Sequence, residues 1–422
     1  MSASLRPAKD GTSAVARVEH CLRRIDEVEG RVHAWVRVDR DGALAAARQR
    51  NANPSGGLLH GIPVGIKDII ATKDLPTECG SPIRRGHMAG RNADCVERLL
   101  SAGAILLGKT VTTEFAHLHP GPTGNPHDPG RTPGGSSSGS AAAVAAGMVP
   151  LALGSQTGGS VMRPASFCGI FGFKSTVGRT DVTGVEELAR SFDTVGWFAR
   201  SAEELTLLAR VLLIRPDYGV PSLPPRARIG VTMTPYAANA SAETQDAVAR
   251  AADALGTTGH KVEPVNLPAG FDGCNAAHRV VVSTEIGRSL AREWREQRAL
   301  FSTELASFIE EALKLPSGAY DTAQGRIAAW RRMFDELMGS YDCLLCPSAA
   351  GEAPQGLGKT GDPVFNSMWS LLGAPCISLP FATGPSGIPV GIQLVGGRGR
   401  DEFLLALAER VTQQLNIQAN QL

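Results

Sequence analysis

The chain has 422 residues, of which 43% are hydrophobic and 20% are charged, values typical of a folded globular protein. Its 42 basic and 41 acidic residues leave a formal net charge of +1, which excludes the strong field that would gather nucleic acid or an anionic membrane. The 48 glycines and 27 prolines indicate many turns.

The amino terminus carries no apolar segment of the kind that directs export. Residues 1–6 are mixed in polarity, and the most apolar run, residues 141–153, is too short to cross a bilayer and contains Pro150. Eight cysteines are spread along the chain without the density of a disulfide-stapled secreted domain. We therefore expect a soluble cytoplasmic protein with reduced thiols.

Three elements are predicted before the first motif. Apolar residues recur at helical spacing after Ser13 and stop at Gly30, which predicts an amphipathic helix with caps at both ends. Residues 32–38 partly alternate and predict a short strand, and residues 43–50 have helical spacing. Neither of the last two elements suggests chemistry.

An α/β alternation follows. Apolar spacing predicts a helix from about residue 92 to Gly103 and then a buried strand over residues 104–107. Residues 120–133 are dense in Pro, Gly and Asn, which predicts a long loop, and residues 141–147 predict a helix of small residues.

The second half of the chain is mostly helical in pattern. Ser201 and Glu204 form a capping box at the start of one of these helices. The Pro-rich stretch 216–225 indicates a surface crossing rather than a domain boundary. The predicted helices begin at Ser201, at Ser241, within residues 283–340 and at Asp401.

Residues 103–110 match the spacing of a phosphate-binding loop. The four central residues are apolar and predict a strand, whereas a phosphate cradle needs backbone N–H groups that converge in a loop. A nucleotide-binding or scaffolding module is thus the disfavoured alternative from a different class. Affinity for ATP without amide turnover would favour it.

Two further patterns are also set aside. Residues 135–139 have the spacing of a hydrolase nucleophile elbow centred on Ser137, but a Pro-rich loop precedes them and no downstream histidine is marked out. Cys343 and Cys346 have the spacing of a redox or zinc pair, yet the two residues between them are apolar, which predicts a buried strand. We expect no metal site.

Two turns rich in glycine and serine, residues 134–140 and 157–160, carry the chemistry. A serine hydroxyl needs a neighbouring base, and a lysine held neutral can act as one. Lys67 lies in the apolar stretch 62–70, where burial disfavours the ammonium and lowers the pKa. The alternatives are a flexible Gly-Ser linker and a lysine paired with Asp68.

Together these residues resemble the amidase signature family, the Ser-cisSer-Lys amide hydrolases. The resemblance covers most of the chain and is loosest over residues 197–340. It implies a single α/β/α domain in which helices cover a large mixed β-sheet. We expect one domain over residues 1–422: a catalytic core over 62–200, a variable helical and pocket region over 201–340, and a C-terminal part of sheet and helix over 341–422.

The family pattern also implies the roles of the site residues. Ser160 is the expected nucleophile, Ser136 the bridging serine after a cis peptide bond, and Lys67 the base. Consecutive backbone N–H groups in a glycine turn can converge on a developing oxyanion. The expected oxyanion hole consists of Thr157, Gly158, Gly159 and Ser160. The reaction needs no cofactor.

Arg163 is the candidate for substrate recognition. It stands three residues after Ser160, where many family members have an arginine two residues after the nucleophile, and this shift resembles the malonamidase branch. There the arginine binds the substrate carboxylate, which a guanidinium can contact through two nitrogens. A structural arginine paired with an acidic group or a helix end is the alternative.

Three other positions depart from the usual family pattern. Gln156 stands where aspartate is common, Ser175 where proline is common, and Trp197 where proline often follows glycine. We expect these changes to alter the pocket and not the catalytic residues.

The predicted activity is the hydrolysis of a small, carboxylate-bearing amide such as malonamate to an acid and ammonia. The alternatives within the enzyme class are another small-amide or carbamoyl hydrolase and the A-type subunit of an amidotransferase. The expected partner is a small-molecule amide, not nucleic acid or a membrane, and a homodimer is left open.

Overall fold

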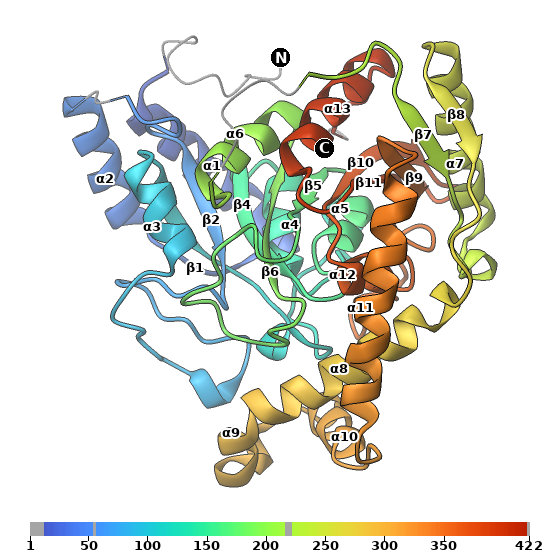
Figure 1. The fold of residues 1–422 in the computed structure, drawn as a ribbon. Helices are drawn as coiled ribbons and strands as arrows, with labels where there is room; N and C mark the ends of the chain where they lie inside the picture. The colour runs from blue at the N-terminus through green and yellow to red at the C-terminus, as the bar shows by residue number, and fades with distance from the viewer. Residues whose placement is uncertain (1–11, 54–55, 216–221, 420–422) are drawn as a thin grey trace.

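A computed structural model describes residues 12–53, 56–215 and 222–419, and these contain thirteen α-helices and one eleven-stranded sheet (Figure 1). The expectations for residues 1–6 and for most of the Pro-rich stretch lie outside the described residues.

The sheet is mixed, as the family resemblance implies. Strand β2 pairs in parallel with β3 and β4, whereas β6, β5, β10 and β11 continue the sheet through antiparallel pairs. In sheet order the strands are β1 (Trp35–Val38), β3 (Ile105–Thr110), β2 (Pro63–Lys67), β4 (Leu151–Gln156), β6 (Thr194–Ala199), β5 (Phe171–Lys174), β10 (Cys376–Thr383), β11 (Pro389–Val395), β9 (Cys343–Pro347), β7 (Arg228–Val231) and β8 (Lys261–Pro264).

Helices cover both faces of this sheet. A Cβ atom on Gly154 would lie 2.7 Å from the Ser137 hydroxyl, at the start of α4. Gly154 pairs with Gly196, and the next residue, Trp197, donates a hydrogen bond to the Leu205 carbonyl of α6. Because successive side chains of a strand point to opposite faces, α4 and α6 lie on opposite sides. Trp197 is fully buried against α6, so its side chain is part of the core.

The predicted helices form, with shifted ends, and α5 and α12 lie where the sequence analysis predicts no helix. In chain order they are α1 (Ala14–Val32), α2 (Arg40–Ala52), α3 (Asp94–Ser101), α4 (Ser138–Ala145), α5 (Met162–Cys168), α6 (Ala202–Leu212), α7 (Ala242–Thr257), α8 (Cys274–Ser289), α9 (Ala291–Glu296), α10 (Thr303–Ala312), α11 (Ala319–Met338), α12 (Ser367–Leu372) and α13 (Asp401–Gln414).

Helix α1 continues two residues beyond the predicted stop at Gly30. His33 takes the left-handed conformation at its end. The Glu29 carboxylate accepts hydrogen bonds from the backbone N–H groups of Ala34 and Trp35, and this holds the chain as it leaves the helix. The helix therefore ends at a left-handed histidine and not at the glycine that is common there, and the Glu29 side chain holds the two residues that follow.

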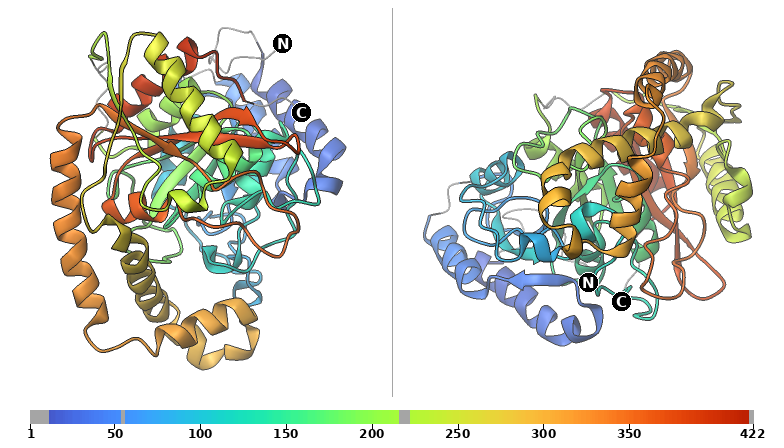
Figure 2. Two further views of the ribbon diagram at one scale, coloured as in Figure 1. Left: turned by 90° about the vertical axis from the view of Figure 1, so that its right-hand side faces the viewer. Right: turned by 90° about the horizontal axis from the view of Figure 1, so that it is seen from below.

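Helices α8 to α11 form an arm that reaches beyond one end of the sheet (Figures 1 and 2). We call these helices, residues 274–338, the helical arm. The region 201–340 is not only helical, because it also supplies β7 and β8 to the sheet.

The phosphate-loop match at residues 103–110 forms strand β3. Lys109 is fully buried, donates hydrogen bonds of 2.7 Å to the Ile70 carbonyl and the Thr77 hydroxyl, and lies 3.3 Å from the Asp68 carboxylate. This lysine therefore joins core elements. Cys343 lies in strand β9, as predicted.

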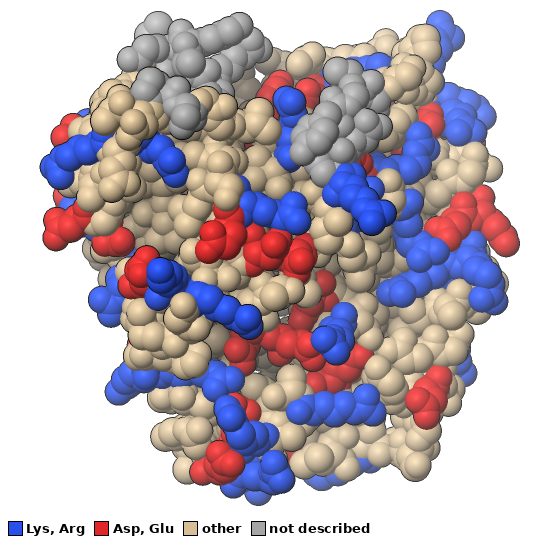
Figure 3. All heavy atoms as spheres, turned by 60° about the vertical axis from the view of Figure 1, so that its left-hand side comes forward, with Lys and Arg blue, Asp and Glu red and all other residues tan. Residues whose placement is uncertain are grey.

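On the face in Figure 3, acidic side chains gather along the middle and basic ones are spread around them, so this face presents no continuous basic surface. None of the helices in the described part of the chain is long and apolar enough to cross a membrane.

Candidate active site

Parallel pairing of β2 and β4 brings the candidate residues together. The carboxyl ends of parallel strands meet at the same edge of a sheet. Lys67 is the last residue of β2, and Ser155 is the last but one of β4. The glycine turn that contains Ser160 begins directly after β4 and leads into α5.

Lys67 contacts two serines. Its Nζ donates a hydrogen bond of 2.7 Å to Ser136 Oγ and one of 2.8 Å to Ser155 Oγ. Burial lowers the pKa of Lys67 to about 7, against a smaller opposing effect of the Asp193 carboxylate. The lysine is therefore poised to exchange a proton near neutral pH. Sequence reasoning identified Ser136 but missed Ser155.

Lys67 is not paired with its neighbour Asp68. The Asp68 carboxylate faces Lys109 instead, and its Oδ2 accepts a hydrogen bond from the Glu78 backbone N–H. The alternative of a Lys67–Asp68 ion pair was thus wrong, because adjacent residues at the end of a strand point in different directions.

The turn before α4 places Ser136 beside Lys67. The Gly135–Ser136 peptide bond is cis, as the resemblance implies. Gly134 has φ +85°, and a Cβ atom there would lie 2.8 Å from the Pro164 backbone. At Gly135 a Cβ atom would lie 2.7 Å from the Thr360 side chain. Both glycines are needed for this close approach.

Ser160 lies at the end of the turn that follows β4 and is partly exposed. No described residue forms a hydrogen bond with its hydroxyl. The structure therefore joins Lys67 directly to Ser136 and leaves the Ser160 hydroxyl free of such contacts.

Gln156 and Asp193 hold the two ends of this turn. Gln156 Oε1 accepts hydrogen bonds from the backbone N–H groups of Val161 and Met162 at 2.8 and 3.0 Å. The Thr157 hydroxyl donates to Asp193 Oδ1 at 2.5 Å. Gln156 thus acts on the backbone of the turn, a role that sequence reasoning did not foresee.

Arg163 is buried beside the turn that carries Ser136. Its Nη2 donates a hydrogen bond of 2.6 Å to the Gly135 carbonyl and one of 3.1 Å to the Thr360 hydroxyl. Nε and Nη1 are buried without a partner among the described residues. Burial lowers the pKa of Arg163 to about 10, and Asp362 opposes this shift without forming an ion pair. The guanidinium therefore has two unused donors.

A small cavity adjoins the site. Ser155, Thr157 and Asp193 contribute to its lining, together with Ala116 and Glu186. Its water-accessible volume is about 10 Å³, about the room that one water molecule needs.

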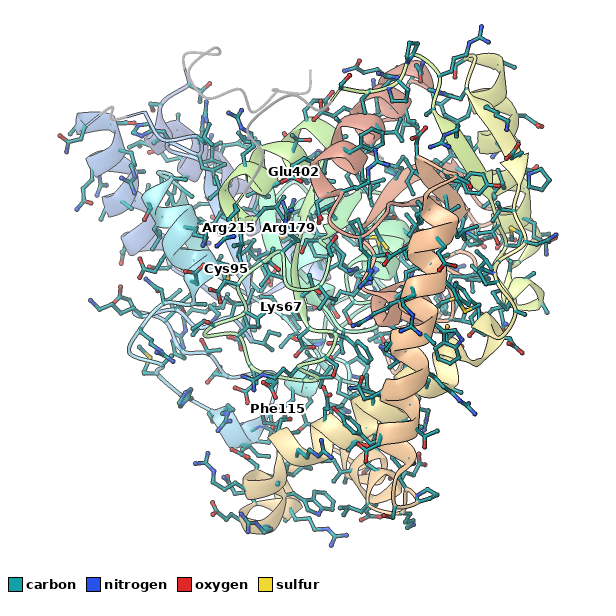
Figure 4. All side chains as sticks on the ribbon, viewed as in Figure 1. Lys67, Cys95, Phe115, Arg179, Arg215 and Glu402 are labelled. Carbon is teal, nitrogen blue, oxygen red and sulfur yellow. The ribbon has the colours of Figure 1, made fainter. Side chains whose placement is uncertain are left out.

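The helical arm packs on the turn Glu114–Ala116, and Ala116 of this turn lines the cavity. Phe115 and Ala116 both have positive φ angles, 44° and 59°. The Phe115 ring stacks on Phe301 of the arm with a centroid distance of 6.2 Å, and Glu114 Oε2 accepts a hydrogen bond from the Ser302 backbone. Figure 4 shows Phe115 between Lys67 and the arm.

Comparison with known proteins identifies extensive similarity. The sequence model of the Amidase family matches residues 16–405. The A-type subunit of the glutamyl-tRNA(Gln) amidotransferase of Picosynechococcus sp. is 33% identical over 94% of this chain and 93% of its own.

Two solved structures are also similar. One, described as the crystal structure of an amidase, has a TM-score of 0.87 and 30% identity over 96% of both chains. The other, with a TM-score of 0.88 and 29% identity, covers 97% of this chain and 96% of its own. It is an inhibitor-bound vestigial protein complex that reveals the evolutionary origins of an s-triazine catabolic enzyme.

Proposed function

Because the chain belongs to the amidase family of amide C–N hydrolases and amidotransferases, we propose that it hydrolyses a small carboxamide to a carboxylic acid and ammonia. The observation that carries the proposal is the buried Lys67, hydrogen-bonded to Ser136 at the edge of the sheet where the turn with Ser160 leads into α5. Such a lysine can serve as the base of a serine hydrolase.

The first half of the reaction forms an acyl-enzyme. Ser160 Oγ attacks the amide carbonyl, its proton passes through the Ser136 hydroxyl to the neutral Lys67 amine, and the turn of residues 157–160 binds the oxyanion. The proton then returns through Ser136 to the leaving nitrogen, the C–N bond breaks and ammonia departs.

The second half releases the acid. Water attacks the Ser160 ester and gives its proton to Lys67 through Ser136. The tetrahedral intermediate collapses, the bond to Ser160 breaks and the serine regains its proton. Every step uses groups of this chain and the substrate.

We assign Arg163 to the recognition of a substrate carboxylate, with malonamate as the preferred candidate. Two of its nitrogens are buried and unpartnered among the described residues, while Nη2 is held by the Gly135 carbonyl. An unpaired buried guanidinium is costly, and a carboxylate that contacts both free nitrogens would satisfy it.

An amidotransferase component is the second candidate. The observation in its favour is the similarity to the A-type subunit of glutamyl-tRNA(Gln) amidotransferase over 94% of this chain. Activity of the purified chain alone on small amides, compared with activity that requires a companion protein and glutamine, separates the two functions.

The role of Ser160 is tested by trapping. Ser160→Ala removes the attacking oxygen. When the variant is incubated with an excess of substrate and the reaction is then quenched, we expect intact-protein mass spectrometry to show no covalent acyl adduct. Ser138→Ala is the matched control, since Ser138 bonds the Gly134 carbonyl rather than Lys67. An acyl adduct that persists in Ser160→Ala would assign the nucleophile to another residue.

The role of Arg163 is tested with malonamate, malonamide, aliphatic amides and aryl amides, with ammonia release as the readout. Arg163→Ala removes a charged hydrogen-bond donor, so we expect a loss of about 1.5–3 kcal/mol in transition-state stabilisation on malonamate beyond that on malonamide. Equal losses on all substrates would return Arg163 to a structural role at the Gly135 carbonyl.

A further inference from the structure

In the turn after β4, the backbone carbonyls of Thr157, Gly158 and Gly159 each accept a hydrogen bond from a group outside residues 157–160. The Thr157 carbonyl accepts a hydrogen bond of 2.9 Å from His278 Nε2, and the Gly158 carbonyl accepts one of 2.7 Å from the Ser370 hydroxyl. The Gly159 carbonyl accepts one of 3.0 Å from the Arg163 backbone N–H. Two of the three donors are side chains distant in sequence, on α8 and α12.

Fixing these carbonyls also fixes the amide protons. In a planar trans peptide the C=O and N–H bonds point to opposite sides, so a carbonyl held on the outer side directs its N–H inward. The N–H groups of Gly158, Gly159 and Ser160 have no acceptor among the described residues. They belong to residues 157–160, the turn to which the proposed function assigns the oxyanion.

His278 is held in one orientation. Its ring is buried and stacks on Phe192 with a centroid distance of 4.9 Å and an interplanar angle of 18°. A Cβ atom on Gly158 would lie 3.4 Å from its Cε1 atom, so the ring lies directly against the turn. Burial lowers the pKa of His278 to about 4, so the ring is neutral and has one ring proton. The Thr157 carbonyl can only accept a hydrogen bond, so the contact of 2.9 Å places that proton on Nε2.

Ser370 is oriented in the same way. Gln156 Nε2 donates a hydrogen bond of 3.1 Å to Ser370 Oγ, which directs the hydroxyl proton toward the Gly158 carbonyl. A carboxylate at position 156 would have no proton to donate and would compete for that of Ser370. Gln156 and Ser370 therefore act as one unit.

We propose that His278, assisted by Ser370, is a positioning residue that aims the oxyanion-binding N–H groups of residues 158–160. The inference rests on the proposed function, because it assigns a task to side chains outside the reacting atoms. Without the Nε2 donor the 157–158 peptide can rotate, which would turn a carbonyl oxygen toward the oxyanion and the N–H of Gly158 away from it.

The experiment compares His278→Phe, which keeps a stacked ring and loses the donor, with His278→Gln, whose amide nitrogen can reach the same carbonyl. Losing one oxyanion donor lowers kcat by about 10²–10³-fold. In His278→Phe the Gly158 N–H is still present but is no longer held in place, so we expect a smaller effect. The value of kcat should fall by about tenfold or more, and KM should stay within about threefold of the wild-type value. His278→Gln should recover most of this loss. Ser370→Ala should also lower kcat more than it raises KM.

A second readout follows the tetrahedral state. Methylboronic acid forms a tetrahedral adduct on a serine oxygen, so its affinity should fall in His278→Phe by about the factor lost in kcat. His260→Phe is the control, because His260 is also buried and hydrogen-bonded but lies at the β8 end of the sheet. An unchanged kcat in His278→Phe, a loss confined to KM, or an equal loss in His278→Gln would overturn the proposal.

These outcomes are separable from a failure of the proposed function. If the wild-type chain hydrolyses no amide in the panel, the proposed function fails, and hydrogen exchange at the Gly158 and Gly159 amides then tests the positioning role. Exchange at least about tenfold faster in His278→Phe than in His260→Phe supports the role, and equal rates overturn it.

Discussion

Three lysines of the described residues are buried at the sheet, and their partners separate their roles. Lys109 faces the Asp68 carboxylate at 3.3 Å, and Lys174 donates to the Ser175 carbonyl. Lys67 and Lys174 both lack an ion pair among the described residues, but Lys67 donates to two hydroxyls, which can pass a proton on, whereas a carbonyl cannot. Of the three, Lys67 is therefore the lysine suited to act as a neutral base.

This difference predicts the pH dependence of the reaction. Below its pKa of about 7 Lys67 is an ammonium and cannot accept a proton. We therefore expect kcat/KM to fall tenfold per pH unit below about pH 7 and to be constant above it. Ser155→Ala removes one acceptor from the ammonium, which should lower the pKa of Lys67 further and move this limb to lower pH.

The pH profile is measured by ammonia release in wild type, Ser155→Ala and Lys67→Ala. Lys67→Ala serves as the control, because its residual rate should show no limb near pH 7. A limb that stays in place or moves to higher pH in Ser155→Ala would contradict the assignment of the limb to Lys67.

At the scale of elements, the helical arm packs on a turn in which two consecutive non-glycine residues have positive φ angles. Phe115 and Ala116 have left-handed conformations that cost about 1 kcal/mol or more each in non-glycine residues. Phe301 and Phe308 pack on this turn through Phe115 and His117. The arm therefore holds in place a segment that also lines the cavity beside Ser155.

Phe301→Ala is expected to loosen this junction. Truncation of a buried aromatic ring costs about 3–5 kcal/mol, and here the loss falls on the contact between the arm and the turn. Amides of residues 291–312 should exchange faster while those of the β4 strand keep their protection, as measured by hydrogen exchange with mass spectrometry. Uniformly faster exchange over both regions would show that the arm does not open separately.

Local patterns predicted most of the elements, because they depend on neighbours within a few residues. The capping box at α6 is confirmed in one half: the Glu204 backbone N–H donates to Ser201 Oγ at 3.2 Å, whereas the Glu204 carboxylate accepts a hydrogen bond from the Arg200 backbone N–H and not from that of Ser201. Lys67 and Ser136 were also predictable, but through family resemblance. His278 and Ser370 had no such signal, since their contacts with the turn after β4 span 121 and 212 residues of the chain.

For the molecule as a whole, the site combines groups from nearly the full length of the chain. Lys67 comes from the first part, the turn after β4 from the middle, and Ser370 from the last part. One continuous sheet includes strands from all of these parts.

The balance of charge predicts how salt acts on the reaction. With a net charge of +1 the chain has no strong long-range attraction for an anionic substrate, and Arg163 is buried, where salt screens little. We expect the ratio of kcat/KM for malonamate to that for neutral malonamide to change less than about threefold between about 20 mM and about 0.3 M sodium chloride. Steady-state ammonia release measures both substrates in the same buffer, and malonamide controls for any general effect of salt on the enzyme. A steep decline of the ratio with salt would mean that surface charges, rather than the buried guanidinium, select the carboxylate.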